Sequence, residues 1–139
     1  MILTEIVHPD ILKALACSGH GTKIVIADGH FPFATMPLPE TPKVYLNYTP
    51  GVLGTIDVLR PLVGCMPIEA AHAPVPDDGA EPPIFREYRA ALPSGLEIKK
   101  VTRFEFYDLV RSPTTGLVIA TAETRPYACI VLVMGVRSF

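Results

Sequence analysis

The sequence has no tryptophan and only three cysteines among its 139 residues. Because Cys17, Cys65 and Cys129 are odd in number and show no CxxC spacing, we expect neither a disulfide framework nor a structural zinc site. Charged side chains make up only 19% of the chain, and 14 acidic residues slightly outnumber 12 basic ones. Binding of nucleic-acid phosphates requires concentrated positive charge, so we expect no nucleic-acid partner.

Long apolar runs and targeting signals are also missing. The apolar stretch 128–136 is well short of the ~20 residues that a membrane-spanning helix needs. The opening residues, MILTEIVHPD, contain no basic segment followed by an apolar one, so we expect no export signal. Together with the unpaired cysteines, these absences predict a soluble, cytoplasmic protein without a membrane partner.

Apolar residues, by contrast, are abundant and make up 49% of the chain. Single domains usually contain roughly 100–150 residues, so we expect one domain over residues 1–139. The few charged side chains cannot cover the surface of such a domain, and large exposed apolar patches usually mark interfaces. We therefore expect a homo-oligomer.

The apolar residues recur at helix or strand spacing, and proline- or glycine-rich segments separate the periodic stretches. Helices are expected over residues 9–18, 52–62, 83–92 and 103–111, and strands over 23–27, 44–48, 66–71, 96–101, 117–121 and 129–133. Thr102 followed by Glu105 is typical of a capping box. Because strands alternate with helices, we predict a three-layer α/β domain whose mainly parallel central sheet is flanked by helices.

A candidate ligand site follows the apolar strand 23–27. Open α/β sheets bind ligands beyond the carboxyl ends of their strands, which is where Asp28, Gly29 and His30 are expected. The Asp28 carboxylate can accept hydrogen bonds from sugar hydroxyls, and Gly29 allows the backbone to approach a ligand closely. Capping of the following turn is an equally good interpretation of Asp28.

His20 lies between Gly19 and Gly21 in the expected turn from helix to strand. An imidazole with an ordinary pKa of about 6.5 suits proton transfer near neutral pH. A turn residue without a catalytic role explains this histidine equally well. The residues alone therefore indicate a polar site near His20, Asp28 and His30 and name no substrate.

No residue pattern indicates a metal or a cofactor. His20 and His30 lie on different expected loops, and the chain contains no HxxxH or HExxH pair on a helix. It also contains no GxGxxG and no P-loop motif that could hold the phosphates of a nucleotide. We expect neither a metal ion nor a cofactor.

Several other reactive side chains are interpreted as structural. Cys17 belongs to the apolar stripe of the first expected helix, and Cys129 belongs to a buried strand, so neither is expected to be a catalytic nucleophile, and core packing is the better interpretation of Cys17. His72 is expected to be solvated in a proline-rich loop. Glu105 and Asp108 are expected on the solvated face of the last helix.

Two separated segments carry a resemblance to a known family. In the string HPDILKALACSGHGTKIVIADGHFPF, residues 19–21 (GHG) and 28–32 (DGHFP) resemble the opening signature of the D-ribose pyranase and L-fucose mutarotase family. That signature is a helix ending in GHG or GHT, an apolar strand, and then D-A-H/G-F/L-P. Residues 123–130 (ETRPYACI), followed by 135–136 (GV), resemble the closing pattern E-x-x-x-Y-x-N-x-x-L-x-x-G-V of the same family.

The resemblance implies interconversion of sugar anomers, or of pyranose and furanose rings, without metal or cofactor, by ring-shaped homo-oligomers that are commonly decamers. By motif position, His20 would be the general acid or proton shuttle, and Asp28 would hold sugar hydroxyls. Arg103 stands where fucose-type members carry arginine and ribose-type members carry histidine. Tyr127 would line a monosaccharide pocket that a neighbouring subunit completes.

The resemblance also bears on the substrate. Arg103 and His30 resemble the fucose branch and imply an L-fucose-like sugar, which they would contact together with Cys129. Two positions depart from the family: Cys129 stands where an asparagine is usual, and residues 65–66 stand where animal fucose mutarotases carry an aspartate-containing string. Loss of the asparagine amide implies that the sugar can differ from L-fucose, and it keeps open the alternative of a carbohydrate-binding or transport-associated protein with little turnover.

Overall fold

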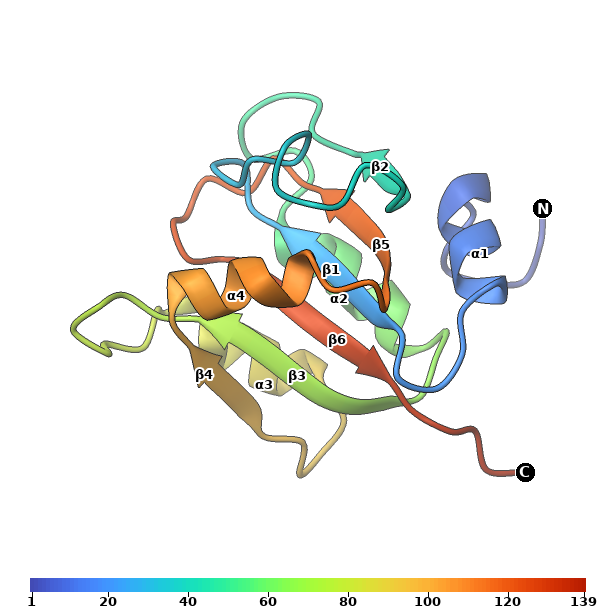
Figure 1. The fold of residues 1–139 in the computed structure, drawn as a ribbon. Coiled ribbons are helices and arrows are strands. Elements are labelled where there is room, and N and C mark those ends of the chain that lie inside the picture. The colour runs from blue at the N-terminus through green and yellow to red at the C-terminus, as the bar shows by residue number, and fades with distance from the viewer.

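Six strands form one sheet in the order β2-β5-β1-β6-β3-β4 (Figure 1). The computed structural model describes the whole chain, residues 1–139. The strands are β1 (Lys23–Ala27), β2 (Lys43–Tyr45), β3 (Ile68–Pro74), β4 (Ile98–Val101), β5 (Thr115–Ala120) and β6 (Ile130–Met134). β6 runs antiparallel to both of its neighbours, β1 and β3, and all other pairings are parallel. The expected mainly parallel sheet is confirmed.

Helices cover both faces of the sheet. They are α1 (Pro9–Ala16), α2 (Thr55–Val63), α3 (Ile84–Ala91) and α4 (Arg103–Val110). Figure 1 shows α4 on one face of the sheet and α2 and α3 on the other. A core of 23 buried residues joins the sheet to α1, α2 and α3, and a smaller cluster of 8 joins it to α4. This is the predicted three-layer α/β architecture, and none of its helices is long and apolar enough to cross a membrane.

Local chemistry explains where these elements form. Ile24, Val25 and Ile26 in β1 are completely buried, as expected for an interior strand with a covering layer on each face. The predicted capping box is present at α4: the Thr102 hydroxyl accepts from the Glu105 amide at 3.2 Å, and the Glu105 carboxylate accepts from the Thr102 amide at 2.7 Å. These reciprocal bonds start α4 immediately after β4.

Several predicted boundaries need correction. The helix expected from residue 52 begins at Thr55, because Gly54 is its N-cap and its amide donates to the Asp57 carboxylate at 2.8 Å. Leu53, counted in the helical stripe, lies outside the helix and is exposed. The strand expected over 44–48 is the shorter β2, and the strand expected over 66–71 is shifted to 68–74.

Two structural interpretations were wrong. Cys17 is exposed rather than in the core, because α1 ends at Ala16 and its buried face is formed by Ile11 and Ala14. His72 lies in β3 rather than in a loop, and its side chain is partly buried on the face that α4 covers incompletely. Burial, followed by the positive charges of nearby lysines, lowers the pKa of His72.

The crossing of one loop over the sheet edge positions the site. β5 and β6 are consecutive in sequence, but β1 lies between them, so residues 121–129 must cross the carboxyl end of β1. Two backbone bonds hold this crossing, from the Thr121 amide to the Ala27 carbonyl at 3.0 Å and from the Gly29 amide to the Glu123 carbonyl at 2.9 Å. The start of β6 therefore lies beside the end of β1.

Candidate functional site

A cavity of about 250 Å³ lies at the edge where β1, β3 and β4 end and β6 begins. Sites for drug-sized ligands usually measure about 300–1,000 Å³, so this cavity suits a smaller molecule. Its location agrees with the rule that open α/β sheets bind ligands beyond the carboxyl ends of their strands. The lining residues are Asp28, His30, Phe31, Pro74, Arg103, Tyr107, Pro126, Tyr127 and Cys129.

Asp28 is the anchor of this cavity and is only 4% exposed. Its Oδ1 accepts from the His30 amide at 2.9 Å, and its Oδ2 accepts from the Ala128 amide at 3.1 Å and from the Cys129 thiol at 3.1 Å. A carboxylate has about four acceptor positions, so three own-chain donors orient the group and leave acceptor capacity for a ligand. Asp28 therefore caps the local turn and faces the cavity, which combines the two alternative interpretations of this residue.

Cys129 and Asp28 are bound to each other in two ways. The Asp28 amide donates to the Cys129 Sγ at 3.2 Å, while the thiol donates back to the carboxylate. Burial, followed by the Asp28 charge, raises the pKa of the Cys129 thiol well above its usual range. The thiol therefore stays protonated and acts as a hydrogen-bond donor rather than a nucleophile.

His30 is held by its ring as well as by its backbone. Its Nε2 lies 3.1 Å from the Thr124 carbonyl oxygen, which can only accept, so Nε2 carries the hydrogen. In the neutral ring the lone pair is then on Nδ1, which is left to accept a proton or a hydrogen bond. His30 lines this cavity and also a neighbouring one of about 350 Å³ formed with residues 47–50 and 121–124.

The α4 side of the cavity supplies a cation and two aromatic rings. Arg103, the first residue of α4, makes no ion pair, and its guanidinium lies 4.8 Å from the ring centre of the adjacent Phe104. Tyr107 follows one helical turn later and also lines the cavity. The Tyr107 ring packs edge to face on Phe31 with 5.9 Å between ring centres. A residue with a permanent positive charge and an aromatic pair therefore line the same cavity as Asp28.

Tyr127 closes the cavity from the crossing loop with an unusual backbone conformation. Its φ is 56°, in the left-handed region that residues other than glycine rarely adopt. Strained residues of this kind persist only where the surrounding structure fixes them, and they are common in ligand sites.

His20 is not part of this cavity. It lies before β1, whereas Asp28 follows β1, so the extended strand separates the two residues. The structure therefore brings Asp28 and His30 together but does not place His20 beside them in the same chain. The His20 side chain is 62% exposed, and its Nε2 lies 2.8 Å from the Glu69 carboxylate.

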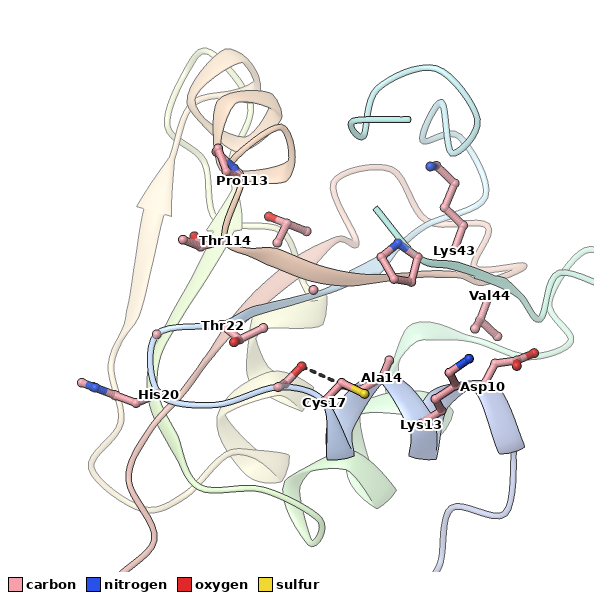
Figure 2. Close-up of a pocket in the computed structure, with 15 residues that line it drawn as sticks. Asp10, Lys13, Ala14, Cys17, His20, Thr22, Lys43, Val44, Pro113 and Thr114 are labelled. Atoms are coloured by element: carbon pink, nitrogen blue, oxygen red, sulfur yellow. Dashed lines mark hydrogen bonds between the residues drawn. The ribbon is translucent and has the colours of Figure 1, made fainter. Parts of the chain in front are cut away.

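A larger cavity of about 640 Å³ opens beside His20, between α1, β2 and the turn before β5 (Figure 2). Figure 2 shows His20 at the margin of this cavity with its ring pointing away from α1. Just over half of the residues that line it are polar or charged, including Asp10, Lys13 and Lys43. Lys43 is already engaged, since its Nζ donates to the carbonyls of Leu38 and Thr41.

The structure thus brings together five of the six predicted site residues, which are Asp28, His30, Arg103, Tyr127 and Cys129. Their roles stay predictions. Tyr107, Phe31, Pro74 and Pro126 also line the cavity and were not predicted. Tyr107 could have been found, because it lies four residues after Arg103 and therefore on the same helix face. No group of histidine, cysteine or acidic side chains is arranged to hold a metal ion.

Comparison with known proteins adds a family and a set of similar structures. The model of the RbsD / FucU transport protein family matches residues 1–137. The fold is similar to that of Bacillus subtilis RbsD complexed with D-ribose, with a TM-score of 0.85 and 28% identity, covering 99% of this chain and 100% of the other. It is also similar to the fucose mutarotase of Streptococcus pneumoniae in complex with L-fucose, with a TM-score of 0.81, 26% identity and 95% coverage of both chains. FucU from Bifidobacterium longum has a TM-score of 0.79 and 28% identity, with 95% and 96% covered.

Proposed function

The chain belongs to the RbsD / FucU transport protein family, and from this premise we propose that it is a cofactor-independent monosaccharide mutarotase that acts on L-fucose or a related sugar. The observation that carries the proposal is the cavity of about 250 Å³ in which an oriented carboxylate, an arginine and two tyrosines meet. Two similar structures contain a bound monosaccharide, D-ribose or L-fucose.

The chemistry of anomer exchange suits this set of side chains. Opening of a cyclic hemiacetal requires one proton to reach the ring oxygen and another to leave the anomeric hydroxyl. Each transfer gains about 10²–10⁴-fold from a positioned acid or base. The reaction forms no covalent bond to the protein, so a well-placed acid, a base and hydroxyl-binding groups are sufficient.

Each lining residue can take a role that its contacts allow. Asp28 accepts a hydrogen bond from a sugar hydroxyl at a carboxylate position that its own chain leaves free. Arg103, a permanent cation, donates hydrogen bonds to the ring oxygen or to hydroxyl oxygens of the sugar. The free Nδ1 of His30 accepts the proton of a sugar hydroxyl. The rings of Tyr107 and Tyr127 contact the apolar face of the sugar while their hydroxyls make polar contacts.

His20 is proposed to act as proton shuttle in the cavity of a neighbouring subunit. It is exposed, and only a short side-chain contact to Glu69 restrains its ring, so a second copy of the chain can receive it. This arrangement requires a homo-oligomer, which we propose to be a ring of ten subunits. Several large apolar side chains are exposed and available for such contacts, among them Tyr45, Tyr48, Val52, Leu53, Phe104 and Val136.

The proposed preference for an L-fucose-like sugar rests on Arg103 and His30 and is qualified by Cys129. A thiol is a weak hydrogen-bonding group, whereas an asparagine amide both donates and accepts. A sugar hydroxyl next to Cys129 therefore contributes less binding free energy than it would next to an asparagine. A sugar related to L-fucose that lacks this hydroxyl, or places it elsewhere, fits the proposal as well as L-fucose does.

The proposal is tested by saturation-transfer proton NMR of anomer exchange with L-fucose, D-ribose, D-galactose and L-rhamnose in separate samples. We expect faster exchange with at least one sugar, and loss of that acceleration in His20→Ala. His72→Gln serves as the matched control, because this histidine lies in β3 away from the cavity and its replacement should leave exchange unchanged. Sugar binding without exchange would overturn the mutarotase proposal and favour a binding or transport-associated role.

A further inference from the structure

A network of charges links the crossing loop to α3. Arg125 donates from Nε to Glu123 Oε1 and from Nη2 to Glu123 Oε2, both at 2.9 Å, and from Nη1 to the Glu87 carboxylate on α3. The Glu123 side chain is almost completely buried, at 7% exposed. The hydrogen bonds from Arg125 are the main cause that lowers the pKa of Glu123 to about 2. This two-point contact between a guanidinium and a carboxylate fixes orientation as well as distance.

Both ends of the network are attached to rigid parts of the fold. Glu87 lies on α3 between Ile84, Phe85 and Tyr88, whose side chains are completely or almost completely buried. Glu123 accepts from the Thr55 amide at the start of α2. The network therefore anchors the crossing loop to two helices of the large core, on the opposite side of the sheet from α4.

Tyr127 lies between this network and a second anchor. On its far side, the Ala128 amide donates to Asp28 at 3.1 Å, and the Ala128 carbonyl accepts from the Thr55 hydroxyl at 2.8 Å. On its near side, the Arg125 amide donates to Glu123 Oε1 at 3.1 Å, and Pro126 has a ring that fixes its φ. Few backbone rotations remain free between the two anchors. The chain can connect them because Tyr127 adopts the left-handed conformation, with a φ of 56°.

We propose that Arg125 is a positioning residue, which holds Tyr127 in its left-handed conformation and so places the Tyr127 ring in the cavity. Arg125 is not among the residues that line the cavity, so it acts through Tyr127 rather than on a ligand. The inference rests on the proposed function in one respect, which is that the ring of Tyr127 contacts the sugar. Release of Arg125 would let the loop relax and move the ring, while Asp28, Arg103 and the sheet stay in place.

The test compares Arg125→Met, which keeps the length of the side chain, with Arg125→Lys, which keeps the charge without the two-point contact. Arg111→Met is the matched control, because Arg111 has a similar side-chain exposure, 49% against 42%, and also pairs with a carboxylate. Fluorine NMR of protein labelled with 3-fluorotyrosine reports the ring environment without any sugar. The chain contains five tyrosines, so at most five signals are expected, and Tyr127→Phe identifies the signal of Tyr127.

We expect Arg125→Met to shift or broaden the Tyr127 signal, Arg125→Lys to do so partly, and Arg111→Met to leave it unchanged. For the sugar that is turned over, kcat/KM should fall about 10- to 100-fold in Arg125→Met, mainly through KM. In a Tyr127→Ala background the same substitution should cause no further loss. An unchanged Tyr127 signal, or losses that multiply in the double variant, would overturn the positioning role.

Glu87→Gln keeps the test decisive if Arg125→Met does not fold. This change removes the negative charge that pairs with Arg125 on α3 and leaves the Arg125–Glu123 contact intact, so we expect a smaller shift of the same Tyr127 signal. No shift in this folded variant would count against the inference. A shifted Tyr127 signal in a protein that exchanges no sugar would overturn the proposed function and still support the placement of Tyr127 by Arg125.

Discussion

His20 and Asp28 lie at opposite ends of β1, His20 before its first residue and Asp28 after its last. The five residues of the strand extend about 16 Å at the usual rise per residue. One monosaccharide cannot contact both side chains of the same chain. If both residues serve one reaction, they must come from different subunits.

This relationship predicts complementation between two inactive variants. His20→Ala lacks the proposed shuttle, and Asp28→Asn lacks the carboxylate that holds the sugar, so each should lose anomer exchange as a pure oligomer. In mixed oligomers made by co-expression, some sites pair an intact Asp28 with an intact His20 from the neighbour. About a quarter of the sites should be restored at equal expression, and saturation-transfer NMR would measure the recovery.

Two observations control this experiment. Mixing the separately purified variants without subunit exchange should give no recovery, and light scattering of each variant should show the same multiple of the 15.1 kDa chain as the wild type. Mixed oligomers without exchange activity would show that His20 does not act in a neighbour's cavity. A stable monomer with full activity would contradict the shared site altogether.

The existence and type of every helix and strand could be predicted, because each apolar stripe or run is bounded by proline, glycine or a capping pair. The register of the sheet could not be predicted from the sequence. The contact between Asp28 and Cys129 depends on β6 pairing with β1, and the two residues are separated by 101 positions in the sequence. Their motifs indicated that both matter but not that they touch.

The separation of His20 from Asp28 was missed for a related reason. Closeness in sequence suggested one site, whereas an extended strand carries its two flanking residues apart. The Arg125 network was missed because charged residues in a short loop resemble ordinary solvated side chains. Only the crossing of residues 121–129 over β1, which follows from the strand order, buries Glu123 and gives Arg125 its partners.

The positive φ of Tyr127 predicts that a glycine variant at this position is more stable than an alanine variant, which reverses the usual order. Both Tyr127→Gly and Tyr127→Ala remove the side chain, but only glycine adopts a φ of 56° without strain. We expect the glycine variant to be more stable than the alanine variant by about 1 kcal/mol, or about 3 °C in melting temperature. Differential scanning calorimetry would measure the difference.

A helical position supplies the contrast for this comparison. Ala90 is exposed in the last turn of α3, so Ala90→Gly should destabilise the protein by less than the roughly 1 kcal/mol expected in a helix interior, but with the same sign. Equal stability of the two Tyr127 variants would mean that the left-handed conformation is not maintained in solution. Both Tyr127 variants should bind sugar more weakly than the wild type.

The ion pair of Glu123 predicts a loss of stability in acid. Hydrogen bonds from Arg125 lower its pKa from 4.5 to about 2. Between these two values the carboxyl is protonated in the unfolded chain but still ionised in the folded protein. The stabilisation is complete above about pH 4.5 and is lost as the pH falls through about 2. Urea unfolding at a series of pH values should show Glu123→Gln less stable than the wild type at neutral pH, with the difference shrinking in acid.

Glu81 provides the matched comparison for Glu123. Arg89 and Lys100 lower its pKa to about 2 as well, but this carboxylate lies on the surface, where solvent screens the pairing. Glu81→Gln should therefore change the unfolding free energy much less than Glu123→Gln at neutral pH. A constant difference between wild type and Glu123→Gln across the acid range would contradict the assigned ion pair.

The thiol of Cys129 predicts a difference between two small substitutions. Cys129→Ser keeps a hydrogen-bond donor for the Asp28 carboxylate, whereas Cys129→Ala leaves Oδ2 with the Ala128 amide as its single own-chain donor. Loss of a hydrogen bond to a buried group costs about 1 kcal/mol, so Cys129→Ala should weaken sugar binding roughly fivefold. Isothermal titration with the preferred sugar would measure it, and Cys129→Ser should stay close to the wild type. Equal affinities in the alanine and serine variants would mean that the thiol fills space without orienting Asp28. In that case Cys129→Asn, which adds an amide, would alter sugar preference by direct contact alone.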